Sequence, residues 1–254
     1  MARRSSLVGL FVLVVPACAT VQHAQSPVVP GLALQVERPG AAETVVYQRS
    51  ITRAGQDSSA GTRTVVLQVV QSLDHGEVLQ VVQRFPGGGG EIVDTAIAEL
   101  STLRAVAHRS HQPTRIMRFT FDGSDAHGTV IALRPAGDSV TPVQQSLGGP
   151  IFDSNVIDLV VAALPLRPGF AAELPFFIYE RGGRVPMPVA VRERATVPFA
   201  RLGARDVWIV SVGVPGAPAT VWVDTRTHEV LRVRYDITAR ALSFTDERVT
   251  PIHG

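Results

Sequence analysis

The segment Asp122-Gly-Ser-Asp-Ala-His127 contains two carboxylates, a hydroxyl and an imidazole within six residues. These groups are the usual components of acid–base or nucleophilic catalysis. No activated-serine motif surrounds Ser124, and no second histidine is placed to assist it. The same residue types are typical of a tight turn between strands. We therefore interpret the segment as a turn and predict no catalytic residue.

Two histidines, His108 and His111, are three residues apart. This spacing places both imidazoles on one face of a helix but on opposite faces of a strand. Pro113 and the alternation around it favour a strand. No metal site is predicted.

The glycine run Gly87–Gly90 follows Phe85-Pro86 and lacks the Gly-Lys-Ser/Thr ending of a phosphate-binding loop. It predicts a hairpin connection. All 24 basic residues are arginine, so a Schiff base, a Ser-Lys dyad and a P-loop lysine are excluded. No cofactor is predicted.

Arginines recur at the two-residue period of a strand, at Arg192 and Arg194 and again at Arg232 and Arg234. If the two strands were neighbours, four guanidinium groups would form a patch suited to phosphate oxygens. The alternative is a solvated outer face on which nearby acidic residues balance these arginines.

The cysteine Cys18 is the only one in the chain, and it follows Arg3-Arg4 and an apolar run from Leu7 to Val15. Nine residues are too few to span a bilayer core, which needs about 20 in a helix, and are typical of a secretory signal. Val15-Pro-Ala-Cys18 resembles the lipobox of bacterial lipoproteins, in which the cysteine receives the lipid. We predict a signal peptide over residues 1–18, lipid anchoring at Cys18 and a periplasm-facing location in the cell envelope.

The residues around Cys18 leave the processing of the signal open and bear on which membrane would carry an anchor. Cleavage after Ala17-Cys18-Ala19 is the alternative, and it would release a soluble protein that begins at Thr20. If Cys18 is lipidated, Ala19 in place of aspartate favours the outer membrane in a host that has one.

Residues 19–40, with Pro27 and Pro30, are predicted to form an extended tether, and residues 41–254 a single β-rich domain. Loss of Arg3 and Arg4 with the signal leaves 22 arginines against 22 acidic residues. A formally neutral body argues against nucleic-acid binding, which depends on many phosphate-neutralising charges. With Cys18 in the signal, the domain has no thiol for a disulfide or a metal.

Apolar residues alternate with polar ones through most of the domain. Val65, Leu67 and Val69 share one face of a strand, and Met117, Phe119 and Phe121 share the face of another. About twelve strands joined by short Gly, Pro or Asp turns are counted in this way, which predicts an antiparallel meander that curls or closes. At least one of Trp208 and Trp222 is expected to be buried.

One helix of about twelve residues is predicted among these strands. Asp153 or Ser154 caps it, and Pro165 ends it. Its apolar stripe consists of Ile157, Val160, Val161 and Leu164. The fold class is therefore mainly β: a large curved antiparallel sheet or half-barrel, with one amphipathic helix packed on the concave face.

Several motifs resemble a family of bacterial periplasmic proteins of unknown function. They are Phe152-Asp-Ser-Asn155, the turn from Leu164 to Phe170, and the hairpin from Val221 to Tyr235. Thr102-Leu-Arg104, His108-Arg-Ser110 and Phe121-Asp-Gly123 add to the resemblance, which covers about residues 44–240. That family is similar in architecture to the lipoprotein-localisation factors LolA and LolB, whose curved sheet wraps a helix and holds acyl chains.

The resemblance implies an envelope protein that binds a lipid or another hydrophobic ligand in a half-barrel cavity, without catalysis. The residues expected to line that cavity are Phe119, Phe121, Phe176, Phe177 and Tyr235. A scaffold for protein interactions, with an interior filled by its own side chains, is the alternative. A hydrolase assembled from several strands is the least favoured hypothesis.

Overall fold

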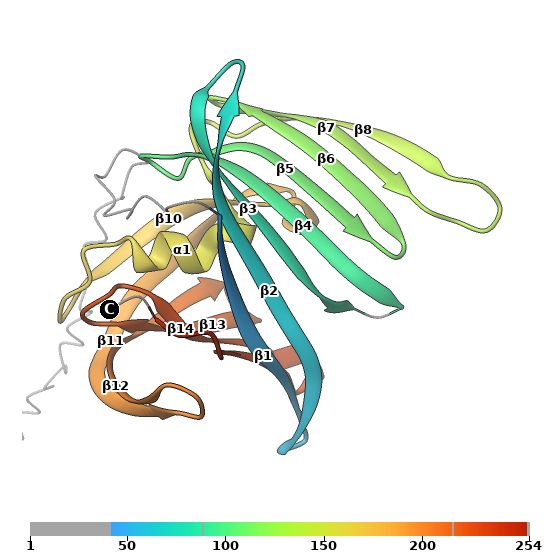
Figure 1. The fold of residues 1–254 in the computed structure, drawn as a ribbon. Helices are drawn as coiled ribbons and strands as arrows, with labels where there is room; N and C mark the ends of the chain where they lie inside the picture. The colour runs from blue at the N-terminus through green and yellow to red at the C-terminus, as the bar shows by residue number, and fades with distance from the viewer. Residues whose placement is uncertain (1–41, 88, 215, 253–254) are drawn as a thin grey trace, which may run out of the picture.

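A computed structural model describes residues 42–252 except 88 and 215. Fifteen strands form one sheet (Figure 1). The first eight are β1 (Glu43–Arg53), β2 (Gln56–Ser72), β3 (Gly76–Gly87), β4 (Gly90–Glu99), β5 (Ala105–Gln112), β6 (Arg115–Asp122), β7 (Asp125–Ala132) and β8 (Ser139–Ser146). The others are β9 (Phe152–Asp153), β10 (Ala171–Ile178), β11 (Gly183–Phe199), β12 (Gly203–Val214), β13 (Ala217–Asp224), β14 (Val230–Ile237) and β15 (Leu242–Arg248).

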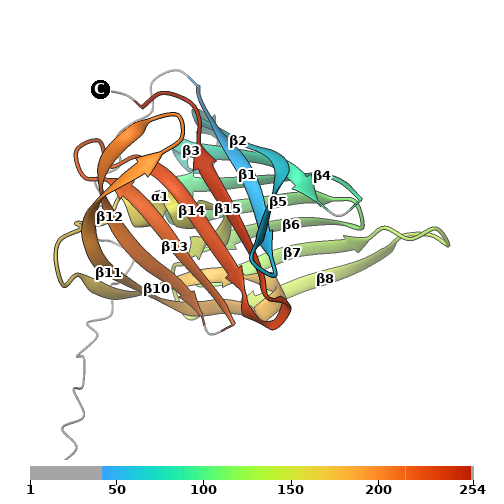
Figure 2. The same ribbon diagram turned by 90° about the horizontal axis from the view of Figure 1, so that it is seen from below.

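The sheet is an antiparallel meander in two halves. Its order is β8-β7-β6-β5-β4-β3-β2-β1-β15-β14-β13-β12-β11-β10-β9, so β1 and β15 pair at its centre although they lie at opposite ends of the domain. Only the two-residue β9 pairs in parallel, with β10. The sheet curls without closing (Figure 2). The predicted curved, mainly β fold is confirmed.

The predicted alternation corresponds to the observed strands. Val65 and Leu67 on β2 are buried, as are Met117, Phe119 and Phe121 on β6. The polar segment around Ser124 is the turn between β6 and β7, and the glycine run joins β3 to β4.

The expectation for the tryptophans is wrong. Trp208 and Trp222 are both only half-buried, Trp208 at the edge of the main core and Trp222 beside Phe199. A register shift between β11 and β12, and another between β13 and β14, interrupt the regular alternation near these residues.

The predicted helix is shorter than expected. A 3₁₀ turn, η1 (Ser154–Val156), leads into α1 (Ile157–Ala162). Asp153 caps η1 by accepting a hydrogen bond from the backbone N–H of Asn155 (2.8 Å). Two further 3₁₀ turns, η2 (Tyr179–Arg181) and η3 (Thr238–Arg240), connect strands.

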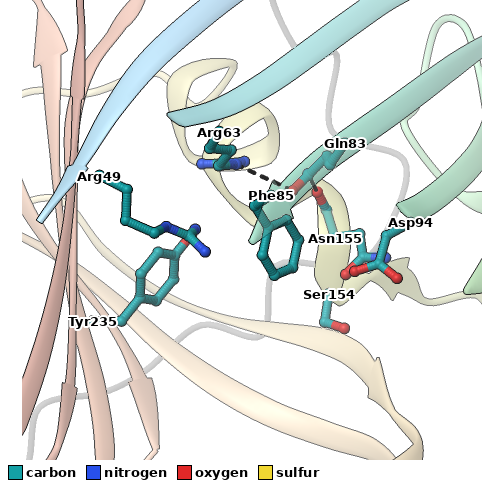
Figure 3. A pocket seen from close by; sticks show the side chains of 8 residues that line it. All are labelled: Arg49, Arg63, Gln83, Phe85, Asp94, Ser154, Asn155 and Tyr235. Atoms are coloured by element: carbon teal, nitrogen blue, oxygen red, sulfur yellow. Dashed lines mark hydrogen bonds between the residues drawn. The ribbon is translucent and has the colours of Figure 1, made fainter. Parts of the chain in front are cut away.

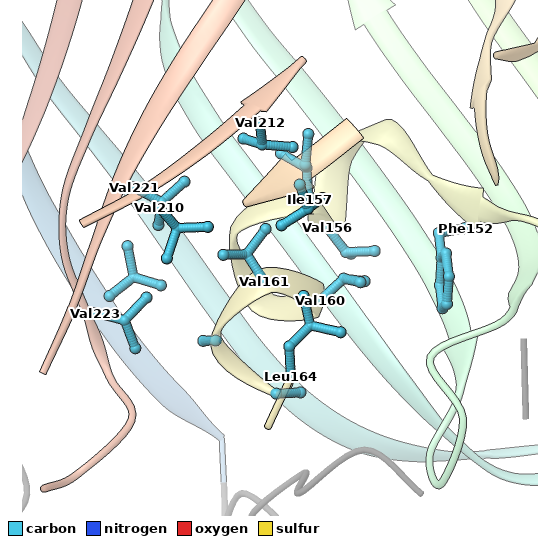
Figure 4. Close-up of a cluster of buried hydrophobic side chains, with 14 of the residues drawn as sticks. Phe152, Val156, Ile157, Val160, Val161, Leu164, Val210, Val212, Val221 and Val223 are labelled. Carbon is cyan, nitrogen blue, oxygen red and sulfur yellow. The ribbon is translucent and has the colours of Figure 1, made fainter. Parts of the chain in front are cut away.

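The helix packs on the concave face, mainly against β13 and β14. Val160, Val161 and Leu164 are completely buried there, together with Val221 and Val223 of β13 (Figure 4). The predicted apolar stripe is therefore the contact between the helix and the sheet. This part of the interior is filled by side chains of the protein itself.

The signal peptide of residues 1–18, including Cys18, and the tether of residues 19–40 lie outside the described residues. Within the part of the chain that is described, no helix has the length and apolar character to cross a membrane.

Candidate ligand-binding site

Charged and polar residues interrupt the apolar inner face of the sheet along its central strands. On β1, Arg49 follows Val45 and Tyr47 at the two-residue period that keeps side chains on one face. Gln83 follows Leu79 and Val81 on β3 in the same way, and both polar side chains are buried. Asp94 lies directly across from Gln83 on β4. These residues form a polar band across the concave face.

Two buried ion pairs form the centre of this band. Asp246 of β15 accepts hydrogen bonds from Nε and Nη2 of Arg49 at 2.7 and 2.8 Å. Arg63 of β2 donates from Nη2 to Asp158 of α1 at 2.7 Å, and its Nη1 lies 3.6 Å from Asp246. Arg63 is 2% exposed and Asp246 is fully buried. The two pairs thus connect both halves of the sheet to the helix.

The protonation states of this centre follow from burial and charge. Burial, the largest single effect, would lower the pKa of Arg63, but Asp158, Tyr235, Asp246 and Tyr47 together outweigh it, and the pKa is raised. Burial also raises the pKa of Tyr47 and Tyr235, against the opposing effect of Arg63. Around neutral pH, the arginine is charged and both phenols are neutral.

A second polar group lies further along the band. His108 Nδ1 of β5 is 2.9 Å from Asp153 of β9. Burial, the largest single effect, would lower the pKa of His108, but the charge and hydrogen bond of Asp153, together with the charges of Asp94 and Glu180, outweigh it and the pKa is raised. Burial raises the pKa of Asp94, while a hydrogen bond from Ser110 opposes that shift.

A cavity of about 230 Å³ opens between these two groups (Figure 3). Eight residues line it, all polar except Phe85: Arg49, Arg63, Gln83, Phe85, Asp94, Ser154, Asn155 and Tyr235. Two buried atoms of this lining, Nη1 of Arg63 and Oδ1 of Asp94, have no hydrogen-bond partner in the described structure. Buried polar atoms are rarely left unpaired in proteins, so these two atoms mark the cavity as a candidate ligand site.

Half-buried apolar side chains continue the inner face beyond the cavity. Ile51 follows Arg49 on β1 and pairs with Phe244 of β15, and Phe85 of β3 pairs with Ile92 of β4. The guanidinium of Arg49 lies 4.5 Å from the ring centroid of Phe85 and 6.0 Å from that of Phe244. We call these four residues, Ile51, Phe85, Ile92 and Phe244, the apolar strip.

Of the five residues expected to line a cavity, four are packed among apolar side chains and one borders the observed cavity. Phe119, Phe121 and Phe177 pack together, with ring centroids 5.2 Å apart for Phe119 and Phe177 and 5.0 Å apart for Phe121 and Phe177. Phe176 is fully buried in the main core. Tyr235 alone of the five lines the cavity described above. The role of the four phenylalanines in ligand binding stays a prediction.

The four-arginine patch is not formed. Arg192 and Arg194 lie on β11, Arg232 and Arg234 lie on β14, and two strands separate these positions. Three of the four are paired with carboxylates: Arg194 with Asp206, Arg232 with Glu247 and Arg234 with Asp236. These three arginines therefore fit the alternative interpretation of the sequence, in which nearby acidic residues balance the arginines on a solvated outer face.

The two histidines considered as metal ligands point to opposite faces of β5, since His108 is buried and His111 is exposed. Among residues 42–252, apart from the two positions left undescribed, no group of three or more His, Cys, Asp or Glu side chains is arranged to hold a metal ion.

An open β half-barrel with a polar cavity on its concave face is the class of protein that these features define. The chain belongs to the family described as protein of unknown function DUF3108, whose model matches residues 47–242. The resemblance to a family of unknown function, expected over about residues 44–240, is thereby confirmed. No curated protein matches the chain.

Several solved structures are similar in outline. A β-barrel-like DUF1849 protein from Brucella abortus is 13% identical with a TM-score of 0.45, and the match covers 84% of this chain and 97% of that one. An exported protein with a YmcC-like fold from Bacteroides fragilis is 11% identical with a TM-score of 0.30, over 85% and 98%. An outer membrane lipoprotein-sorting protein domain from Vibrio parahaemolyticus is 10% identical with a TM-score of 0.27, over 84% and 86%.

Proposed function

We propose that this protein is a non-catalytic binding protein of the cell envelope that holds an amphiphilic ligand on its concave face. The polar end of the ligand occupies the cavity, and its apolar part lies along the apolar strip. The observation that carries the proposal is the position of a polar cavity, with two buried atoms that have no hydrogen-bond partner, directly beside half-buried apolar side chains.

The size of the cavity supports an amphiphile whose polar end alone is enclosed. Pockets that enclose a whole drug-sized ligand measure about 300 to 1,000 Å³, and this cavity is smaller, at about 230 Å³. A ligand placed here therefore extends out of the cavity. Phe85 belongs both to the cavity lining and to the apolar strip, so it marks the direction of that extension.

Two energetic terms favour such a complex. A buried polar atom without a partner costs about 1 to 3 kcal/mol, and a polar ligand group would remove this cost at Arg63 and Asp94. Covering roughly 300 Å² of apolar surface contributes about 7.5 kcal/mol at about 25 cal/mol per Å², before the cost of association. Together these terms are compatible with micromolar binding, which corresponds to about 8 kcal/mol.

The predicted export signal gives the proposal its cellular setting. A secretory signal ending at Cys18 directs the domain to the envelope, where molecules with acyl chains are abundant. Lipid anchoring at Cys18 would hold the domain at a membrane surface.

An interaction scaffold is the second candidate. It is favoured by the filled interior beneath α1 and by the packed rings of Phe119, Phe121 and Phe177. Because these side chains pack against one another, we place the ligand beside the helix, at the cavity.

The two candidates are separated by a displacement assay with N-phenyl-1-naphthylamine, a neutral fluorescent probe. We expect saturable binding to the purified full chain, displacement by 1-lauroylglycerol, and loss of binding in Phe85→Asp. Leu73→Asp is the control, because Leu73 is fully exposed at the turn between β2 and β3. Urea unfolding of each variant checks that it is folded. Absence of saturable binding, or equal binding by the two variants, would favour the scaffold.

A further inference from the structure

We infer that the polar end of the ligand is uncharged and carries hydroxyl groups, as the glycerol of an acylglycerol or the sugar of a glycolipid does. This inference rests on the proposed function and adds the chemical class of the ligand. It is drawn from the charges and the hydrogen-bonding capacity of the cavity lining.

The positive charges of the cavity are already compensated by the protein. Arg49 binds Asp246 through two short hydrogen bonds, and Arg63 binds Asp158 through one. Two guanidinium groups and two carboxylates therefore sum to zero within this centre. An anionic head group would have to compete with carboxylates that are already buried in contact with these arginines, so the cavity is poorly suited to a phosphate or a carboxylate.

The other ionisable groups of the lining do not add positive charge. Tyr235 is neutral because burial raises the pKa of its phenol. Asp94 is the remaining acid of the lining, and burial raises its pKa as well. Neither side chain supplies a positive charge to an anionic ligand, and an ionised Asp94 would repel it.

The two atoms without a hydrogen-bond partner are best complemented by a ligand that both accepts and donates hydrogen bonds. Nη1 of Arg63 can only donate, whereas Oδ1 of Asp94 accepts when the carboxyl group is ionised. A hydroxyl group does both. A carboxylate can satisfy the arginine alone, and a quaternary ammonium group can donate no hydrogen bond and accept none. Polyols are the simplest class that satisfies both atoms at once.

The other polar groups around the cavity are of the same mixed type. Ser154 contributes a hydroxyl, Asn155 an amide and Tyr235 a phenol to the lining. Each of these groups can both donate and accept a hydrogen bond. They offer several partners to a head group with more than one hydroxyl, and none of them selects for charge.

A series of ligands with the same twelve-carbon chain tests the inference. 1-Lauroylglycerol and dodecyl glucoside carry hydroxyl heads, whereas laurate, dodecyl phosphate and dodecyltrimethylammonium carry charges. Each would be titrated below its micelle concentration against the full chain loaded with N-phenyl-1-naphthylamine. We expect at least one hydroxyl ligand to bind tenfold or more tightly than all three charged ligands, a difference of about 1.4 kcal/mol.

The outcomes are distinguishable from failure of the proposed function. If every ligand of the series binds equally, or a charged one binds most tightly, the head-group inference is overturned while amphiphile binding stands. If none displaces the probe, the proposed function fails and the inference fails with it. A preference between glycerol and glucoside identifies the source of the hydroxyl groups, and either preference supports the inference.

Variants at Asp94 separate hydrogen bonding from charge. Asp94→Asn keeps an oxygen that accepts, so lauroylglycerol binding should stay within threefold of wild type, whereas Asp94→Ala should weaken it tenfold or more. Asp74→Ala, at the exposed turn between β2 and β3, is the matched control. Equal losses in Asp94→Asn and Asp94→Ala would show that the charge of Asp94 is what the ligand recognises, and no loss in Asp94→Ala would remove Asp94 from the site. Either result would contradict the inference.

Discussion

Replacing Asp246 with asparagine should destabilise the protein strongly while leaving its shape almost unchanged. Asp246 is fully buried and accepts two hydrogen bonds from Arg49, at 2.7 and 2.8 Å. Its second oxygen also lies 3.6 Å from Arg63. Asparagine has nearly the same volume, so the change removes the negative charge without opening a cavity. One carboxylate, Asp158, then remains for two buried guanidinium groups.

The magnitude follows from the number and type of interactions. Hydrogen bonds to charged groups contribute about 1.5 to 3 kcal/mol each, and Asp246 accepts two of them. Breaking a buried ion pair by removing one partner costs about 3 to 5 kcal/mol. We therefore expect a loss of about 3 to 5 kcal/mol in the free energy of unfolding, a large part of the total stability of about 5 to 15 kcal/mol of a typical domain.

Urea unfolding followed by far-ultraviolet circular dichroism measures this loss, with Glu91→Gln as the control. Glu91 pairs with Arg84 at 3.2 Å, but both side chains are more than half exposed. Such surface pairs contribute less than about 1 kcal/mol. If Asp246→Asn and Glu91→Gln lowered the free energy of unfolding equally, Asp246 would not hold the buried arginines, and the account of the polar band would be refuted.

Three other predictions concern the helix, a histidine and the anchor. Leu164→Ala should lower the free energy of unfolding by about 2 to 5 kcal/mol because Leu164 is fully buried beneath the sheet; a loss below 1 kcal/mol in urea unfolding would show that the helix is not an integral part of the core. The pKa of His108 is raised above its ordinary value of 6.5 beside Asp153, so the stability that His108 contributes should be complete below pH 6.5 and fall as the pH rises through the folded pKa. The free energies of unfolding of wild type and His108→Asn, measured between pH 6 and 8.5, should therefore converge as the pH rises. A constant difference between them would contradict the pairing. Cys18→Ser should move the full chain from the membrane fraction to the soluble fraction, whereas an unmodified mature N-terminus at Thr20 in the wild type would identify ordinary signal cleavage.

The sheet could be predicted from the sequence because its strands carry local signals. Alternation at Val65 and Leu67, and again at Met117 and Phe119, requires only the two-residue period of a strand. The cap at Asp153 and the apolar stripe of the helix are also local. The length of the helix was overestimated, because the segment begins with the 3₁₀ turn from Ser154 to Val156 and has six α-helical residues after it.

The polar band was missed, although a signal for it exists. Arg49, Gln83 and Asp94 each occupy an inward position in a strand whose other inward positions are buried and mostly apolar. A buried charge is costly without a partner, so a charged residue in such a position predicts a partner elsewhere in the chain. The partner could not be found locally, since Arg49 and Asp246 are 197 residues apart and meet only because β1 pairs with β15.

The phenylalanines proposed as a cavity lining illustrate a related limit. The sequence indicates that Phe119, Phe121 and Phe177 face inward, and they do. It does not indicate whether inward aromatic rings pack against one another or border an open space. That depends on the curvature of the sheet, which brings β10 against β6 so that Phe177 contacts both Phe119 and Phe121.

A crystal structure of the full chain with 1-lauroylglycerol tests the central claim most directly. The account predicts hydroxyl oxygens of the glycerol within about 3 Å of Nη1 of Arg63 and of Oδ1 of Asp94, with the acyl chain in contact with Phe85 and the other residues of the apolar strip. An empty cavity at saturating ligand, or an acyl chain bound on another face of the sheet, would contradict it.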